Sequence, residues 1–415
     1  MERRGRVVSD RLEPVVITGV GVVAGACCGI DALAAALHGS TSLAAEVESR
    51  SPYHRAGSAA QGVLATGVDL SPWVPPAMGR RMGRPSRFAA AAARMALIDA
   101  GDVAVADATT AVVMATAFGA IEATEQLLRV ERREGPAMVS PFGFTESVAN
   151  AAAAHIAIAT GAHGPNITIA QREAGALTAV GRGALEVASG RARYALVGCA
   201  EEMPPILHAF LDRFEALARA TATLTEAARP FDRRRNGFLA AEGAVVLVLE
   251  SEHAARARGA RIRARIRGFA SAFDATASRI GWGRGHAALG GAVTWLLQRT
   301  ATDRARVTRI VSGASGAMAG DRLEADVLHD IWRESALPTV LAPKAHTGEY
   351  GGGFLAAAVL GATGATAGPT AGFDEVDPAL HVTPHPGGPL PAADVTLVTS
   401  LASGGAASWL LLETV

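Results

Sequence analysis

Glu173 is the charged side chain best placed to do chemistry, because it lies in a predicted strand-to-helix turn. It follows an apolar, strand-like run at 166–170 and precedes a helix of small residues expected over 174–189. Enzymes of the α/β class often place a nucleophile at such a turn, since a helix N-terminus lowers the pKa of a thiol and stabilises developing negative charge. No Cys, Ser or Thr occupies that position here, so a carboxylate stands where a nucleophile would be expected.

Strand-like and helical patterns alternate along the whole chain. Runs of strand character occur at 15–23, 111–116, 166–170, 194–199, 244–250, 263–272, 307–312, 339–342, 394–400 and 407–414. Helical patterns fill the gaps at 31–38, 86–100, 120–133, 146–159, 174–189, 288–300, 322–335 and 352–363. This alternation predicts parallel or mixed sheets with helices on their faces. Because the order recurs, we predict an α/β fold of two similar βαβαβ-type halves that stack in five αβαβα layers.

The predicted organisation is a short tail followed by two halves. Residues 1–13 are expected to form a mobile N-terminal tail, residues 14–255 the first half and residues 256–415 the second, with no linker between them. An Arg-rich stretch at 256–267 alternates Arg with Ala and Ile, and we expect an edge-exposed strand there. The segment 384–392, rich in Pro and Gly, is expected to be a surface loop.

Composition narrows the class of function. The chain has 39 Lys and Arg against 39 Asp and Glu, so no net charge favours a nucleic acid or a membrane surface as partner. Hydrophobic residues make up 49% of the chain but aromatic residues only 5%, which indicates a large core of closely packed small side chains. The three cysteines, Cys27, Cys28 and Cys199, match no zinc or redox spacing, and so low a count fits a cytoplasmic protein. We expect Cys199 to be a buried, inert thiol.

The histidines do not form a recognisable metal pattern. His208, His381 and His385 have no companion ligands at metal-binding spacing, so we predict no metal site. His155 is expected to pack within a helix, and His346 to lie in a loop or at an interface.

Several motifs, in the same order along the chain, resemble those of β-ketoacyl synthases. The most specific are ArgProPheAsp at 229–232 and AsnGlyPheLeuAlaAlaGluGlyAlaValValLeuValLeuGlu at 236–250. The segment LysAlaHisThrGlyGluTyrGlyGlyGly at 344–353 resembles the second histidine motif of that family. SerLeuAlaSerGlyGlyAla at 400–406 resembles its glycine-rich C-terminal strand end. The resemblance extends from about residue 14 to the C-terminus, and it implies the thiolase fold independently of the alternation.

Condensing enzymes of that family use one Cys and two His, and all three positions differ in this chain. The resemblance places the Cys at Glu173, the first His at Gly313 and the second His at Glu349. Condensation needs a thiolate that holds the acyl chain and donors that polarise a malonyl thioester as CO2 leaves. Gly313 supplies no side-chain donor, and an ionised Glu349 supplies only acceptors. We therefore expect no condensing activity.

Some other residues of the family's site are present in this chain, and one is replaced. Lys344, Asp321 and Glu324 match the family's motifs and are retained. Ser403 falls where condensing enzymes have a gating Phe above the active site. Because such a gate serves an acyl-enzyme, its loss is consistent with an inactive site.

The loss of all three catalytic residues is similar to that in chain-length factors, the ketosynthase-β subunits of type II polyketide synthases. Their second histidine region also tends to be a Tyr followed by three Gly, as at 350–353, although many carry Gln where this chain has Glu173. The resemblance implies a catalytically inactive subunit that forms a heterodimer with an active ketosynthase and shapes the tunnel controlling polyketide or polyene chain length. It implies no cofactor of its own, because the phosphopantetheine of an acyl carrier protein would act through the partner.

The resemblance also points to an interface. Ketosynthases dimerise through the strand before the nucleophile helix, and the segment preceding that strand would border the partner's acyl tunnel. The interface and tunnel candidates are therefore Phe142, Phe144, Val148, Asn166, Ile167, Thr168 and Ile169. Bulky side chains in the tunnel would stop a growing chain, whereas the alternative for each apolar residue is ordinary helix packing.

Two other functions stay open. Glu173 and Glu349 could form the acid and base pair of a malonyl-carrier-protein decarboxylase or of a hydrolase, with Arg172 and Lys344 as cationic partners. The same charges could instead belong to a fossil site that is neutralised by a buried network. The chain could also be a non-catalytic homodimer that only binds carrier proteins.

Overall fold

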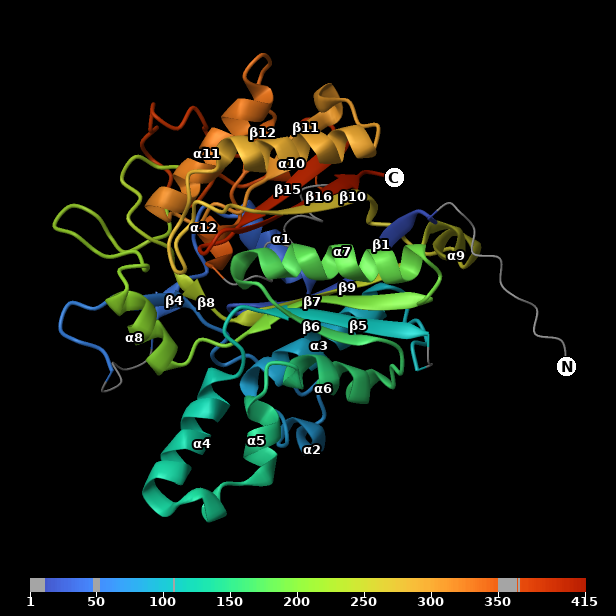
Figure 1. Ribbon diagram of the computed structural model, residues 1–415, viewed down its shortest axis with the longest axis vertical. Coiled ribbons are helices and arrows are strands. Elements are labelled where there is room, and N and C mark those ends of the chain that lie inside the picture. Colours follow the sequence, from blue (N-terminus) through green and yellow to red (C-terminus); the bar gives the residue numbers. More distant parts are fainter. Residues whose placement is uncertain (1–11, 48–52, 107–108, 350–363, 365) are drawn as a thin grey trace, which may run out of the picture.

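The computed structural model describes residues 12–47, 53–106, 109–349, 364 and 366–415 (Figure 1). Its strands are β1 (Val15–Ala24), β2 (Cys27–Cys28), β3 (Ala45–Glu46), β4 (Gln61–Val63), β5 (Thr110–Thr116), β6 (Asn166–Ala170), β7 (Tyr194–Glu201), β8 (Ala240–Ala241), β9 (Gly243–Ser251), β10 (Ala264–Phe273), β11 (Val307–Val311), β12 (Thr339–Leu341), β13 (Thr366–Ala367), β14 (Gly388–Pro389), β15 (Val395–Leu401) and β16 (Ala406–Glu413).

The α-helices are α1 (Ile30–His38), α2 (Pro76–Gly79), α3 (Arg84–Asp99), α4 (Ile121–Glu134), α5 (Pro141–Ser147), α6 (Ala151–Thr160), α7 (Gly175–Ala188), α8 (Pro205–Arg213), α9 (Glu252–Ala257), α10 (His286–Arg299), α11 (Met318–Trp332) and α12 (Lys344–Thr347). The described residues also form the short 3₁₀ helices η1 (Pro136–Met138), η2 (Arg172–Ala174) and η3 (Arg304–Arg306). Within the described ranges, no helix has the length and apolar composition needed to cross a membrane.

The main sheet repeats one topology twice. Its strands follow the order β12-β11-β15-β16-β10-β1-β9-β7-β5-β6, and β2 pairs with β1. One set of five strands is β1, β5, β6, β7 and β9, and the other is β10, β11, β12, β15 and β16. When the strands of each set are numbered in chain order, both sets run third, second, fourth, fifth, first from the outer edge of the sheet to its centre. In both sets the second strand is parallel to the third and fourth, and the fifth is antiparallel to both of its neighbours. The predicted α/β fold of two similar halves is thus confirmed.

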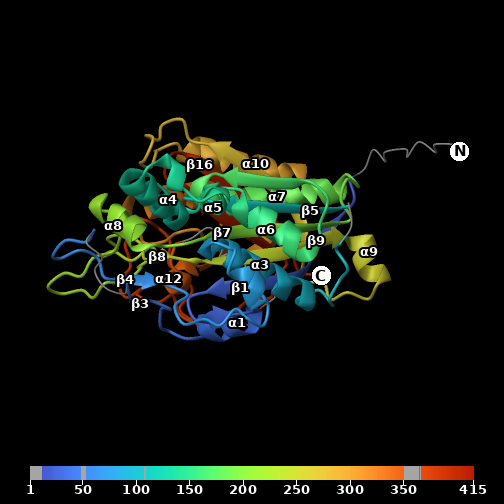
Figure 2. The ribbon, with the colours of Figure 1, turned by 90° about the horizontal axis from the view of Figure 1, so that it is seen from below.

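Helix α7 lies between the two five-stranded sets, and it contacts β5, β7 and β9 on one side and β10 and β16 on the other (Figure 1). Helices α10 and α11 cover one outer face of the molecule. Seen from below, α3 and α6 lie across the strands of the other outer face (Figure 2). The layers therefore alternate as helix, sheet, helix, sheet, helix.

Two glycines explain how α7 fits against both sheets. A Cβ atom at Gly181 would lie 2.4 Å from Cγ of Phe269 on β10, and one at Gly183 would lie 2.2 Å from Cγ1 of Val197 on β7. No side chain fits at either position. The small residues that dominate this helix therefore set the spacing of the central layer.

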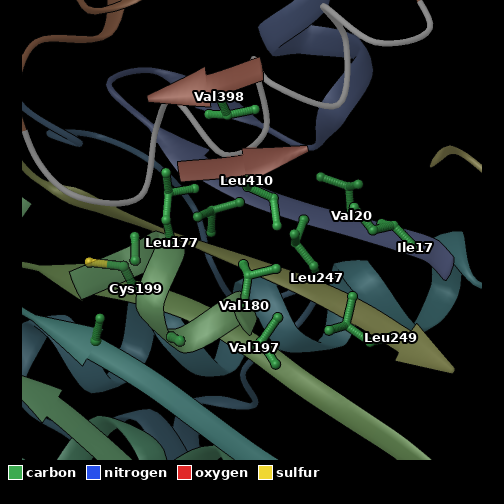
Figure 3. Close-up of a cluster of buried hydrophobic side chains, with 14 of the residues drawn as sticks. Ile17, Val20, Leu177, Val180, Val197, Cys199, Leu247, Leu249, Val398 and Leu410 are labelled. Carbon is green, nitrogen blue, oxygen red and sulfur yellow. The ribbon is translucent and has the colours of Figure 1, made fainter. Parts of the chain in front are cut away.

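The core surrounds the same helix. Leu177 and Val180 of α7 lie among Val197 and Leu247 of the first set of strands and Leu410 of the second (Figure 3). All five side chains are buried, and full burial of each stabilises the fold by about 1.5–3 kcal/mol. Because the cluster joins both sets of strands, it holds α7 between them.

The structure corrects several predicted elements. The helix expected at 146–159 is wrong at its start, because Val148 adopts an extended conformation that separates α5 from α6. The edge strand expected at 256–267 is also wrong, because α9 extends to residue 257 and β10 lies inside the sheet between β16 and β1. Within β10, the guanidinium of Arg265 forms salt bridges with Glu252 and with Glu413.

Other predictions lie partly or wholly outside what the structure tests. The helix expected at 352–363 and most of the tail expected at 1–13 lie outside the described residues. The division at residues 255 and 256 stays a prediction, and it falls inside α9. His346 is buried in α12 rather than placed in a loop, and its ring nitrogens lie 3.1 Å from the carbonyl oxygen of Thr41 and 3.2 Å from that of Pro369.

Candidate functional site

The turn before α7 places Glu173 between a strand end and a helix N-terminus. Strand β6 ends at Ala170, and η2 then carries Arg172 in a left-handed conformation with φ 49°. That conformation costs about 1–2 kcal/mol for a residue with a side chain. The Arg172 guanidinium offsets part of it by donating to Ser403 Oγ at 2.8 Å, and the Ser400 hydroxyl donates to the Glu173 carbonyl oxygen at 2.7 Å. The C-terminal strand region thus holds the turn in place.

The structure brings Glu173 and Glu349 to one cavity. Burial, and then repulsion by Glu349, raises the pKa of Glu173 from its usual 4.5 to about 7. The positive charges of Lys344 and Arg172 oppose that rise. Glu173 is therefore poised to hold or release a proton near neutral pH, which a solvated carboxyl group does not do.

Lys344 is the direct ionic partner of Glu349. Its Nζ lies 2.7 Å from Glu349 Oε2, and the two side chains are only 1% and 9% exposed. The backbone N–H of Glu349 donates to the carbonyl oxygen of Leu239 at 2.8 Å, which fixes the residue beside β8. Among the described residues, neither Glu349 Oε1 nor Glu173 Oε2 has a hydrogen-bond partner, although both atoms are buried.

Gly313 follows β11 in a position without room for a side chain. Its N–H donates to Thr399 Oγ1 at 3.0 Å. A Cβ atom there would lie 2.8 Å from the carbonyl oxygen of Thr399 and 3.1 Å from Cα of Ser400. A histidine at this position would require the backbone of β15 to move, so the local structure fits the glycine.

Asp321 and Glu324, which were expected to match the family's motifs, lie on α11 beside this region. Asp321 accepts backbone N–H bonds from Phe231 at 2.8 Å and Ser315 at 3.1 Å. Glu324 Oε1 accepts from the Ser312 hydroxyl at 2.6 Å and also from the Thr399 hydroxyl. Burial raises the pKa of both carboxyl groups, that of Asp321 to about 7. These two carboxyl groups hold the loop after β11, which carries Gly313, against strand β15.

The cavity is largely apolar and has a volume of about 540 Å³. Its walls come mainly from α8 and the segment after it, with one residue from the start of α4. They include Ile121, Ile206, Leu207, Leu211, Ala216 and Phe238. Phe210, Phe214 and Ile280, more than half exposed, also line it and mark its opening to solvent. Helix α8 was missed in the sequence analysis, although its Pro205 at the first turn is a recognised start signal.

Glu201 is a second feature that the sequence analysis missed. It ends the buried strand β7, lines the cavity and is 1% exposed. Burial raises its pKa to about 8, although the backbone N–H groups of Ala117 and Phe118 donate to its carboxylate. Two adjacent acids, Glu201 and Glu202, at the end of an apolar strand were the available signal.

The interface candidates lie on one side of the molecule. Phe142, Phe144 and Val148 are 79%, 60% and 37% exposed, which argues against ordinary helix packing for them. Helices α4 and α5 project together from the body (Figure 1). Strand β6 is the last strand of the described sheet, with Asn166 exposed and Ile167, Thr168 and Ile169 half-buried. These residues therefore present an apolar projection beside a free sheet edge.

The remaining candidates do not add a catalytic group. Cys199 is buried beside Glu201, and burial holds the pKa of its thiol well above the usual value. His155 is held by Glu146, with Nε2 and Oε1 2.5 Å apart. Across the part of the chain that the structure describes, no three His, Cys, Asp or Glu residues are grouped so as to hold a metal ion.

Comparison with known proteins gives the family of this architecture. A family model described as the β-ketoacyl synthase N-terminal domain matches residues 12–255. The chain is 30% identical over 313 residues to "Granaticin polyketide putative beta-ketoacyl synthase 1" of Streptomyces violaceoruber, covering 72% of this chain and 74% of that protein. It is 31% identical over 281 residues to 3-oxoacyl-[acyl-carrier-protein] synthase 2 of Rhizobium meliloti, covering 63% and 64%.

Solved structures share the fold over nearly the whole chain. A structure described as the ishigamide ketosynthase/chain length factor matches with a TM-score of 0.88 and 26% identity, covering 97% of this chain and 100% of that one. A structure of a type II polyketide synthase acyl carrier protein in complex with its ketosynthase matches with a TM-score of 0.86. Its 24% identity, over 98% of this chain and 100% of that one, makes it evidence for the fold alone.

Proposed function

Because this chain belongs to the β-ketoacyl synthase family, we propose that it is a non-catalytic, ketosynthase-like subunit of a type II polyketide synthase. It would pair with an active ketosynthase and shape the acyl tunnel that controls polyketide or polyene chain length. The observation that carries the proposal is the turn before α7, where Glu173 occupies the nucleophile position in an otherwise intact strand-turn-helix arrangement.

The chemistry around that turn supports an inactive site. A carboxylate is a poor nucleophile toward a thioester and would repel the enolate that forms as CO2 leaves. Glu349 cannot replace a histidine donor, because its Oε2 already binds Lys344 and its other oxygen can only accept while ionised. Gly313 contributes only a backbone N–H, and that group donates to Thr399.

Cys199 does not supply a substitute nucleophile. The reactive form of a cysteine is the thiolate, and burial beside Glu201 keeps this thiol protonated. In addition, its Sγ lies 3.8 Å from Glu201 Oε1, so loss of its proton would place two negative charges together.

The exposed face of α5 supports a heterodimer. Phe142 and Phe144 project from the body, and large apolar side chains left exposed together mark interaction sites. The free edge of β6 lies on the same side and offers unpaired backbone groups to another strand. The similarity to the ishigamide ketosynthase/chain length factor favours a ketosynthase as the occupant of this face. A carrier protein would then deliver its phosphopantetheine to that partner, and this chain would need no cofactor of its own.

The test is co-expression with a candidate ketosynthase from the same organism, followed by product analysis. We expect the two chains to copurify, and we expect Phe142→Ala and Phe144→Ala to weaken the complex or lengthen the product. Trp295→Ala, a change at an exposed aromatic residue on α10, is the matched control and should leave both unchanged. A stable homodimer that ignores the ketosynthase would contradict the proposal and favour a module that only binds carrier proteins.

One observation keeps an enzymatic alternative in view. A carboxyl group with a pKa near 7 beside a cavity is what general acid or base catalysis requires, and Glu173 has both properties. A malonyl-carrier-protein decarboxylase or a hydrolase using Glu173 and Glu349 would lose its activity in Glu173→Gln. An inactive subunit would keep its effect on product length in the same variant.

A further inference from the structure

The cavity of this chain combines apolar walls with an acceptor-rich end. Glu173, Glu201 and Glu349 are its three carboxylates. The Glu201 carboxylate accepts hydrogen bonds from the backbone N–H groups of Ala117 and Phe118. In contrast, Glu173 Oε2 and Glu349 Oε1 have no donor among the described residues. The Glu349 side chain is only 9% exposed, so solvent does not easily donate a hydrogen bond to that oxygen.

The nearby cations donate no hydrogen bond to these two oxygens. Lys344 Nζ binds the other oxygen of Glu349. The Arg172 guanidinium donates to Ser403 and to the carbonyl oxygen of Arg279. A buried acceptor without a donor is unfavourable, so two of them at one cavity favour a ligand that donates hydrogen bonds.

We propose that this cavity binds a primary alkylammonium compound, with its apolar chain along α8 and its ammonium group between Glu173 and Glu349. An ammonium group has three N–H donors and no acceptor, which matches two carboxylate oxygens better than a hydroxyl group does. Leu207, Leu211 and Phe238 provide apolar surface for the chain, and the half-exposed Phe210 and Phe214 flank its way in. A fatty carboxylate supplies no hydrogen-bond donor and would add another negative charge beside Glu173 and Glu349.

This inference goes beyond the proposed subunit role and does not depend on a ketosynthase partner. The experiment is isothermal titration calorimetry on the purified full chain at pH 8.5, where Glu173 is ionised and an alkylamine is still protonated. The probes are n-octylammonium, 1-octanol and octanoate, which share one chain length and differ only in the head group. We expect octylammonium to bind about tenfold or more tightly than octanol, and octanoate to bind least, since charge-assisted hydrogen bonds are the stronger ones.

Three variants separate the head-group site from the cavity. Glu173→Gln and Glu349→Gln should each weaken octylammonium binding about tenfold while leaving octanol binding nearly unchanged. Ala216→Trp should block the cavity and abolish binding of octylammonium and octanol without altering any charge. Glu334→Gln, a change at an exposed carboxylate far from the cavity lining, is the control for a general loss of negative charge.

The proposal is overturned if octanol or octanoate binds as tightly as octylammonium. It is also overturned if both glutamine variants bind octylammonium normally, or if the folded wild-type chain binds none of the three probes. Circular dichroism on every variant distinguishes lost binding from lost folding. None of these results bears on whether the chain pairs with a ketosynthase, so the two proposals fail separately.

Discussion

Two neighbouring pairs of buried acids behave differently in this molecule. Asp321 and Glu324 are each surrounded by protein donors, whereas Glu173 and Glu349 each leave one oxygen without a donor among the described residues. The first pair holds together the loop after β11 and strand β15, which the fold needs. The second pair faces a cavity, where side chains can change without rearranging the backbone. The comparison supports the proposal that this chain keeps the scaffold of a condensing site with other side chains at its catalytic positions.

The largest expected effect comes from removing the cation of the second pair. Lys344→Met should destabilise the chain by about 3–5 kcal/mol at pH 8, because it leaves Glu349 buried without its ionic partner. Urea denaturation measures the change. The double variant Lys344→Met/Glu349→Gln should recover most of the lost stability. A single variant as stable as the wild type would show that Lys344 does not hold the pair.

The first pair should be nearly as sensitive. Asp321→Asn presents an amide to backbone N–H donors that now meet a carboxylate, and it should destabilise the chain by about 3 kcal/mol. The control Asp326→Asn, on the solvent side of the same helix, should stay within about 0.5 kcal/mol of wild type. Equal effects from the two substitutions would contradict a structural role for Asp321.

Unlike the two substitutions above, Glu173→Gln should raise the free energy of unfolding at alkaline pH. Its folded pKa of about 7 lies above its usual 4.5, so its contribution to stability is present below pH 4.5 and is lost as the pH rises through 7. Glu173→Gln should therefore stabilise the chain by about 2 kcal/mol at pH 8 and by little at pH 5. Asp321 and Glu201 shift in the same direction, so part of the alkaline loss should remain. Denaturation curves at both pH values provide the measurement, and a variant less stable than wild type at pH 8 would contradict this account.

The smallest expected effect tests the fit at Gly313. A Cβ atom there meets the Thr399 carbonyl oxygen at 2.8 Å, so Gly313→Ala should destabilise the chain by about 1–2 kcal/mol. Gly291→Ala is the control, because nothing lies within 4 Å of a Cβ atom at that position of α10. If Gly313→Ala proves neutral, the backbone around Gly313 does not require a glycine there.

The sequence predicted the fold better than it predicted the site. Strand β6 and helix α7 were found within a few residues, because apolar period and glycine turns are local signals. The interior position of β10 was not found, since a strand's place in a sheet depends on partners far along the chain. For the same reason the motif positions of Glu173 and Glu349 were available from sequence, but their shared cavity with Glu201 was not. Helix α8, which builds much of the cavity wall, was missed although Pro205 in its first turn is a start signal, because one proline alone does not distinguish a helix start from a loop.

The most direct test of the central claim is the turnover of malonyl-acyl carrier protein by the purified chain alone. Intact-protein mass spectrometry would follow the carrier protein, with an active ketosynthase as the positive control. An inactive subunit, with Glu173 at the nucleophile position, should leave the malonyl group unchanged. Loss of CO2 or hydrolysis that disappears in Glu173→Gln would contradict the account and make the chain an enzyme in its own right.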